Sequence, residues 1–504
     1  MPRTTTTGAT PGAGRRVHAL AAAALLMVYL AVMSGHMTSM DGFLIQRQAQ
    51  SLALEHSIRF QTPARFWKGE AIWTSKFGIG LSLLYVPGMM LASPLAAMVP
   101  TAMEQPQKAA TFYFKQLYEN PLYTVGGSWV HAVIAAFGAY LVARLMTALG
   151  CSLRATLWGM AFYGIGSSTL VYSRGDFAQP LEGLCWTAAL LAAVRFRHSG
   201  ASSALWACAA AVGYAILTRP FEGMLLLPAV LALVVPARLS QWNLRALRPV
   251  LAVVAGALVA VAITGLVNWA RSGSAVEFGY RLENAWRVPD ASRLAHVLVG
   301  PARGILWEFP AIVLVPLGAV ALVRRGCRRE AQALLLLCGA LLLNTASWKM
   351  WWGGWCWGLR LFLPAIPLLA VVAGAGIDRL GPNLRRWLPG LALLAGFVWA
   401  LPGVLTDMLE GFARMTDAAP TAWTLDAFPP YGAWRFLKRP FPDTAIDNDV
   451  VDILWFRLAP VTGYWSLLVP IVLLAFAVLL AVWSARELLA EERKERAQGS
   501  TRAR

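Results

Sequence analysis

The sequence predicts an all-α fold: a polytopic bundle of about 12 transmembrane helices, with extracytoplasmic loops and interfacial helices. Of its 504 residues, 58% are hydrophobic and 14% are charged, and that charged fraction is about half of what a soluble protein carries. Apolar runs of roughly 20 residues, long enough to cross a bilayer as helices, recur from Val17 to Trp483. Barrel strands would instead alternate apolar and polar residues over about 10 positions. The runs do not alternate, so the spans are helical.

Basic residues recur in clusters, and two helices with a turn fit between most neighbouring clusters. The clusters are Arg15 with Arg16, Arg144 with Arg154, Arg195 with Arg197, Arg238 with Arg245 and Arg248, Arg324 to Arg329, Arg379 to Arg386, and the tail after Arg486. Because basic loops stay on the cytoplasmic side, we expect these clusters and both termini to face the cytoplasm of a bacterial inner membrane. These loops account for the net charge of +18, and no nucleic-acid partner is needed to explain it.

The clusters divide the chain into a cytoplasmic tail (1–16), a catalytic bundle (17–406), an extracytoplasmic loop (407–463), a last helix (464–485) and a cytoplasmic tail (486–504). The first apolar run is long for a signal peptide, so we expect an uncleaved span followed by an outer loop over 35–123. Within that loop, Phe77 to Val99 could cross the membrane, but a lone crossing would invert every later cluster. Pro87 and Pro94 therefore predict a broken, re-entrant element, unless a second crossing lies within 101–123.

Asp41, the first acidic residue of the chain, follows the first span at the expected outer face. An ionisable group at a membrane boundary is a functional candidate because its desolvation is costly. Asp41 suits the role of a general base that removes a proton from an attacking hydroxyl. It would equally suit the N-cap of a helix over 42–56. The residue alone leaves both interpretations open.

The segment Tyr172 to Glu182 forms the predicted outer turn between two spans and contains four polar candidates for substrate binding: Arg174, Asp176, Gln179 and Glu182. They fall within one or two helical turns of each other. One interpretation is a structural turn closed by an Arg–Asp pair. The other is a second polar group that faces Asp41 across a cavity.

Arg219 interrupts a long apolar stretch within Leu217-Thr-Arg-Pro-Phe-Glu222. A guanidinium at headgroup depth suits a phosphate, which it binds in bidentate fashion. Lys76 could add a second positive charge to the same anion. Snorkelling, or a private pair between Arg219 and Glu222, is the alternative.

The densest aromatic cluster is Trp348-Lys-Met-Trp-Trp-Gly-Gly-Trp-Cys-Trp-Gly-Leu-Arg360. Aromatic faces beside a cation suit a cavity for a sugar or a lipid phosphate, so Trp352 and Arg360 are candidate binding residues. A tryptophan belt that anchors the protein in the interface is the alternative. The chain has no G-x-x-x-x-G-K-[ST] loop, no H-E-x-x-H and no G-x-S-x-G, which disfavours nucleotide-driven, zinc-protease and serine-hydrolase chemistry.

These landmarks, in this order, resemble the GT-C superfamily of glycosyltransferases that use polyprenyl-phosphate donors, in the bacterial branch related to protein O-mannosyltransferases and the lipid A aminoarabinose transferase. The likeness covers most of the chain. It includes Asp41, Ser-Lys76-Phe-Gly-Ile-Gly, Tyr-Ser-Arg174 with Gln-Pro, Leu-Thr-Arg219-Pro, Gly300-Pro-Ala-Arg-Gly-Ile-Leu-Trp307 and the cluster ending at Arg360.

The resemblance implies that Asp41 is the catalytic base or positions the acceptor, that Lys76 and Arg219 hold the lipid phosphate, and that Arg360 lines the same cavity. Gln179 departs from the pattern, because relatives commonly carry Glu or Asp there. The neutral amide weakens the case for a metal at that position. It leaves open whether Asp176 or Glu182 substitutes for the missing acid or whether the protein has lost activity. No soluble cofactor is implied, and a divalent cation remains open.

The implied partners are a polyprenyl-phosphate-linked sugar donor, the lipid bilayer, and an envelope glycan, lipid or protein that accepts the sugar through a hydroxyl with inversion. Two other functions compete with this one. A secondary transporter or flippase would also have about 12 spans, although here the polar residues gather at the outer ends. An inactive accessory membrane protein is the third hypothesis.

Overall fold

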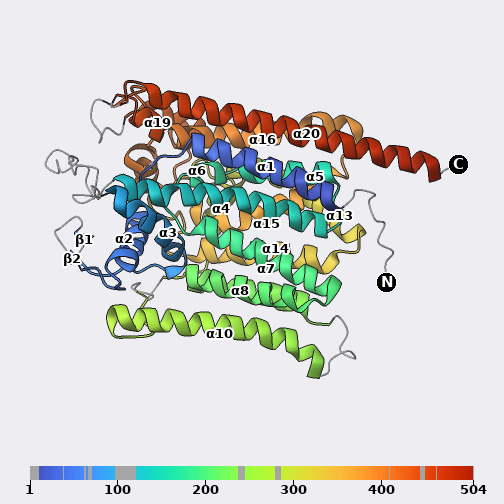
Figure 1. Ribbon diagram of the computed structural model, residues 1–504, viewed down its shortest axis with the longest axis horizontal. Helices are drawn as coiled ribbons and strands as arrows, with labels where there is room; N and C mark the ends of the chain where they lie inside the picture. The colour runs from blue at the N-terminus through green and yellow to red at the C-terminus, as the bar shows by residue number, and fades with distance from the viewer. Residues whose placement is uncertain are drawn as a thin grey trace.

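The computed structural model describes residues 11–37, 39–61, 64–65, 71–96, 121–236, 244–278, 285–407, 409–442, 449–460 and 462–502. It confirms the predicted all-α bundle, in which long helices lie side by side (Figure 1). The strands in the described part are β1 (Ala64–Arg65) and β2 (Ala71–Ile72), which pair antiparallel.

The long helices of the bundle are α1 (Pro11–Ala31), α3 (Ile79–Ala96), α4 (Pro121–Ala148), α5 (Leu153–Gly164), α7 (Gln179–Ser199), α8 (Ser202–Thr218), α9 (Pro220–Val234), α10 (Leu244–Ser272), α13 (Val315–Arg324), α14 (Arg328–Ser347), α15 (Ile366–Ile377), α16 (Pro382–Leu405) and α20 (Leu468–Arg502). The shorter α-helices are α2 (Met40–Leu54), α6 (Thr169–Tyr172), α11 (Ala291–Val299), α12 (Ile305–Glu308), α17 (Arg414–Ala418), α18 (Pro429–Gly432) and α19 (Leu454–Arg457). Single turns of other helix types are η3 (Pro310–Leu314), η4 (Arg360–Ala365), η5 (Leu409–Ala413), η6 (Leu425–Ala427), η7 (Ala433–Phe436) and η8 (Trp465–Leu467).

Seven of the described helices are long and apolar enough to cross a membrane, and four shorter apolar helices accompany them. The helices differ in burial. The segment Arg360–Ile377, at the centre of the bundle, has 89% of its residues buried, whereas α10 has 28% and α20 only 11% of their apolar windows buried. Helices α10 and α20 lie on opposite edges (Figure 1). Their exposed apolar faces suit contact with lipid, as expected of a multi-pass membrane protein. The count of about 12 spans stays a prediction.

In the part of the chain that the structure describes, the arginine clusters come together at one end of the bundle, as their spacing predicted. Ion pairs join the helix ends there: Arg16–Glu487, Arg154–Glu492, Arg197–Glu330 and Arg325–Asp378. The start of α1 and the end of α20 lie at this same end (Figure 1). We call it the basic end, and we call the opposite end, which carries α2, α11, α17 and α19, the loop end. That the basic end faces the cytoplasm stays a prediction.

Helix α3 is continuous, so the expected break at its prolines is wrong for the part that the structure describes. Pro87 and Pro94 both lie inside the helix. Proline removes a backbone donor, but neighbouring helices let a membrane helix tolerate this loss, and α3 packs against α2 and α4. Gly88 lies so close to the backbone of Gly126 in α4 that a Cβ there would stand 2.7 Å from the Gly126 carbonyl oxygen. The possible second crossing within 101–123 falls largely outside the described residues.

Candidate active site

A cavity opens to solvent at the loop end, and its empty space of about 1130 Å³ includes the solvent at its mouth. It lies between the start of α2, the segment before α3, the break between α8 and α9, the end of α10 and η4. Four of the predicted site residues line it, and they come from four separate parts of the chain: Asp41, Lys76, Arg219 and Arg360. The other candidates do not line the cavity: Arg174, Asp176, Gln179, Glu182 and Trp352.

Asp41 sits in the first turn of α2, where its carboxylate reaches the cavity. It is not the helix cap, so the alternative interpretation of Asp41 as an N-cap is wrong. Ser39 caps the helix instead, because its hydroxyl accepts a hydrogen bond of 2.9 Å from the Gly42 amide. One Asp41 oxygen lies 2.6 Å from Arg360 Nη1. The side chain is 25% exposed, so an incoming hydroxyl can reach it.

Arg360 is carried by a loop that glycine makes possible. Gly353, Gly354 and Gly358 all have positive φ, at 79°, 73° and 57°, which other residues adopt only with strain. The Arg360 guanidinium stacks over the Phe177 ring with 4.3 Å to its centroid. Stacking and the Asp41 pair together fix the guanidinium at the wall of the cavity.

Two buried ionisable side chains hold that loop from behind, and both belong to the Gly300–Trp307 landmark or adjoin it. Arg303, 2% exposed, donates to the carbonyls of Trp352 and Gly358. Glu308 accepts a hydrogen bond from the Leu359 amide, directly before Arg360. We call Arg303 and Glu308 the loop clamp. Sequence analysis recognised the landmark but assigned these two residues no role.

Close packing at two glycines also places Lys76 and Arg219 at the same cavity. Gly78 and Gly80 pack directly on the backbone of Thr218, where a Cβ on either glycine would clash. Thr218 ends α8, Pro220 begins α9, and Arg219 lies in the extended break between them. The Ser-Lys-Phe-Gly-Ile-Gly landmark therefore docks on the Leu-Thr-Arg-Pro landmark.

Arg219 has two acidic partners. Its Nε lies 3.2 Å from Glu182, which is fully buried, and it also pairs with Glu222. The private-pair interpretation therefore holds, with Glu182 as an unforeseen second partner. The Glu222 carboxylate alone balances the guanidinium, so Arg219 presents little net positive charge to the cavity. Its role as a phosphate ligand stays a prediction.

Sequence analysis missed Arg271, in the last turn of α10. It is buried yet lines the cavity. Its Nη1 donates to the Phe77 carbonyl at 2.8 Å and its Nη2 to Gln48 Oε1 at 3.3 Å. Among the described residues no carboxylate pairs with it, and its Nε has no hydrogen-bond partner. The signal in the sequence was a lone arginine at the outer end of a long apolar helix, a costly position for a charge.

A wall of aromatic side chains faces the charged side chains. The sequence predicted only the part of it that belongs to the cluster from Trp348 to Arg360. Phe221 lies 5.1 Å from Phe278 and 6.1 Å from Trp286, and Trp286 lies 4.9 Å from Trp348, measured between ring centroids. All four rings line the cavity. Tilted and edge-on rings of this kind suit a sugar face or an isoprenoid chain.

Trp352, from the same cluster as Trp348, turns away from the cavity. Its indole N–H donates to Asp417 at 2.5 Å, and Trp355 donates to the other oxygen of Asp417 at 2.7 Å. These bonds tie the tryptophan-rich loop to α17. The structure therefore divides the cluster, with Trp348 and Arg360 at the cavity and Trp352 in the loop packing.

Gln179 and Glu182 lie in the first turn of α7, both buried. Glu182 reaches the cavity indirectly, through Arg219. The amide oxygen and nitrogen of Gln179 have no hydrogen-bond partner among the described residues. No group of three His, Cys, Asp or Glu side chains in the described part of the chain could hold a metal ion.

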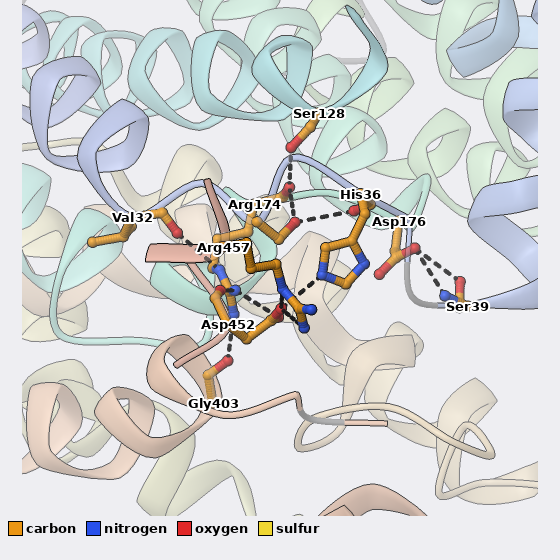
Figure 2. Close-up of polar contacts among 10 residues, drawn as sticks. Val32, His36, Ser39, Ser128, Arg174, Asp176, Gly403, Asp452 and Arg457 are labelled. Atoms are coloured by element: carbon orange, nitrogen blue, oxygen red, sulfur yellow. Dashed lines mark hydrogen bonds and ion pairs between the residues drawn. The ribbon is translucent and has the colours of Figure 1, made fainter. Parts of the chain in front are cut away.

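Arg174 and Asp176 form a separate polar cluster behind α2 (Figure 2). Arg174 ion-pairs with Asp452 at 2.7 Å, and it also donates to the carbonyls of Val32 and Gly403, each at 2.9 Å. Asp176 accepts hydrogen bonds from the backbone and hydroxyl of Ser39 at 3.0 and 3.3 Å. These contacts are structural supports of the site rather than parts of the cavity wall.

The helical bundle is similar in fold to a solved GT-C glycosyltransferase, which is the fold expected from the sequence. The structure is similar to ArnT, the lipid A aminoarabinose transferase, from Cupriavidus metallidurans. The apo form gives a TM-score of 0.51 and the form bound to undecaprenyl phosphate gives 0.52. Each is 16% identical and covers 94% of this chain, and this chain covers 74% and 75% of ArnT. At that identity the likeness establishes the fold.

The Archaeoglobus fulgidus oligosaccharyltransferase in complex with Zn and sulfate aligns at a TM-score of 0.42 and 12% identity, over 79% of this chain and 53% of that one, too loosely to bear on the argument. No family model matches the chain, and no curated protein is similar to it in sequence.

Proposed function

We propose that this protein is an inverting glycosyltransferase that moves a sugar from a polyprenyl-phosphate donor to a hydroxyl acceptor at the extracytoplasmic face. The observation that carries the proposal is the cavity itself. A reachable carboxylate, Asp41, shares the cavity with an aromatic wall and with a buried cation, Arg271, that has no acidic partner in the described part of the chain.

The charges suggest how the donor phosphate is held. Arg360 is neutralised by Asp41, and Arg219 by Glu182 and Glu222. Among the described residues Arg271 is a buried cation available to meet an anion, and Lys76 lines the same cavity. A buried cation costs free energy until an anion arrives. We therefore assign the phosphate to Arg271 and Lys76, with Arg219 and Arg360 behind them.

The chemistry follows from this placement. The bond between the anomeric carbon and the phosphate oxygen breaks, and positive charge develops on the sugar. The bonding electrons leave with the polyprenyl phosphate, whose growing negative charge Arg271 and Lys76 stabilise. The acceptor oxygen attacks the opposite face of the anomeric carbon, and Asp41 takes its proton. Attack opposite the leaving group inverts the anomeric centre.

The fold supports a lipid-linked donor. ArnT, which shares the fold, has been seen bound to undecaprenyl phosphate. The aromatic wall of Phe221, Phe278, Trp286 and Trp348 gives this chain an apolar surface beside its cations, as a phosphate on an isoprenoid chain would require.

The test is release of free polyprenyl phosphate from a panel of polyprenyl-phosphate sugars, with purified protein in nanodiscs and a membrane extract as the source of acceptor. We expect release from one donor class and transfer of its sugar to the extract. Movement of a lipid-linked sugar across liposome membranes without conversion would instead favour a flippase. Neither conversion nor movement, in folded protein, would favour an accessory protein.

A further inference from the structure

Asp452 belongs to the predicted outer loop over 407–463 and is one of the most enclosed charged residues at the loop end. Its side chain is 1% exposed, and three cationic or protonatable groups surround it (Figure 2). Arg174 lies 2.7 Å away, Arg457 2.7 Å and His36 2.6 Å. None of these residues lines the cavity, so the proposed chemistry does not use them directly.

The cluster draws together segments that are far apart in the sequence. Asp452 and Arg457 belong to the last outer loop, Arg174 to the turn before α7, and His36 to the chain leaving α1. Two backbone hydrogen bonds join the same segments. The Leu454 amide donates to the Met33 carbonyl at 2.8 Å, and the Asp452 amide donates to the Leu405 carbonyl at 2.9 Å.

The Asp452 carboxylate is stabilised in its charged form. Burial alone would raise the pKa of this carboxyl group, but His36, Arg457 and Arg174 outweigh burial and hold the pKa well below its ordinary value. Removing the charge would leave Arg174 buried without its acidic partner, which is a costly state.

A continuous path of contacts leads from this cluster to Asp41. The Arg174 carbonyl accepts hydrogen bonds from Ser128 at 2.6 Å and Ser34 at 3.2 Å. Two residues later Asp176, in the left-handed region with φ 86°, accepts from the Ser39 amide at 3.0 Å. Ser39 in turn caps α2, and Asp41 lies in the first turn of that helix.

We propose that Asp452 is a positioning residue for Asp41, acting through Arg174, Asp176 and the Ser39 cap. The inference rests on the proposed function and deepens it: the last outer loop, far away in the sequence, sets where the catalytic carboxylate stands. A base displaced by about 1 Å can lose roughly 100-fold in rate while binding is retained, so the expected signature is a change in kcat rather than in KM.

The experiment compares Asp452→Asn with Asp449→Asn, using release of polyprenyl phosphate. Asp449 is a matched control because it belongs to the same loop and pairs with arginine, but its partner is Arg439 within that loop. We expect Asp452→Asn to lower kcat about 10- to 100-fold with KM changed less than about twofold. Asp452→Glu, which keeps the charge, should recover part of kcat, and Asp449→Asn should match wild type.

A second readout does not depend on activity. The Asp41→Cys variant is labelled with a maleimide in backgrounds with Asp452 intact, Asp452→Asn and Asp449→Asn. The native cysteines are all buried or half-buried, and a parent without the Asp41→Cys change gives their background. A several-fold change in labelling rate with Asp452→Asn alone supports the proposal.

Equal kcat and equal labelling in the Asp452→Asn and Asp449→Asn variants would overturn it, even if Asp452→Asn lowered Tm. Should the wild type release no polyprenyl phosphate from any donor, the proposed function fails, and the labelling rates still decide whether Asp452 positions Asp41.

Discussion

Charged residues pair at both ends of the bundle, but they pair in different surroundings. At the basic end, Arg16 and Glu487 are 3.6 Å apart with side chains 57% and 26% exposed. At the loop end, Arg174 and Asp452 are 2.7 Å apart with side chains 5% and 1% exposed. Exposed pairs contribute about 0–1 kcal/mol, whereas buried ones carry a desolvation cost of several kcal/mol per ion. The acids Glu330 and Glu491 at the basic end are also buried, but each faces a more exposed cation. A pair with both charges enclosed, kept despite that cost, therefore points to the loop end as the functional end.

At the loop end, the largest loss of activity should follow the substitution of Arg271. Arg271→Gln removes the buried cation that we assign to the donor phosphate, and kcat/KM for donor should fall about 100-fold or more. Arg435→Gln is the control, since Arg435 lies at the loop end but is 45% exposed and pairs with Asp426. Steady-state release of polyprenyl phosphate measures both. Equal activity of the two variants would remove Arg271 from the phosphate site.

A change in the loop clamp should have the next largest effect on activity. Arg303→Met leaves buried carbonyls of the tryptophan-rich loop without a donor, each at about 1–3 kcal/mol. We expect a lower Tm, and kcat about 10-fold lower because Arg360 loses its support. Thermal unfolding and release of polyprenyl phosphate are measured on the same preparation. Normal kcat in a destabilised variant would show that the clamp does not position Arg360.

The aromatic wall should have a smaller effect, confined to binding. Trp286→Ala removes a ring that contacts Phe221 and Trp348, and we expect the donor KM to rise about 5- to 10-fold, as the loss of about 1–1.5 kcal/mol implies. Trp286→Phe keeps an aromatic face and should lie closer to wild type. A fall in kcat at unchanged KM would contradict a binding role.

The smallest effect should come from the basic end. Arg16→Gln breaks an exposed pair, so the free energy of unfolding should change by less than about 1 kcal/mol and the release of polyprenyl phosphate should not change. The measurement is unfolding in detergent beside the activity assay. Loss of activity in this variant would contradict the functional difference between the two ends.

Much of this arrangement could be predicted from the sequence, because the order of apolar runs and arginine clusters places residues at one end or the other. Asp41, Lys76, Arg219 and Arg360 flank spans at the same end, and all four do line one cavity. The predicted break of α3 was wrong because packing on α2 and α4 sustains a helix that its prolines alone would interrupt.

Pairing between distant segments could not be predicted. Arg174 and Asp452 are separated by 278 positions, and nothing local indicates which acid meets which arginine. Arg219 likewise pairs with Glu182 from another helix, so a residue that looked like a phosphate ligand is already neutralised. Arg271 shows the opposite case: only the fold reveals that none of the described carboxylates pairs with it.

The most direct test of the central claim separates donor binding from donor cleavage in Asp41→Asn. Binding of the donor to protein in nanodiscs and release of polyprenyl phosphate would be measured together. If Asp41 is the base and the cations hold the phosphate, Asp41→Asn binds donor within a few-fold of wild type and releases it about 100- to 10,000-fold more slowly. Release at the wild-type rate from Asp41→Asn would contradict the account.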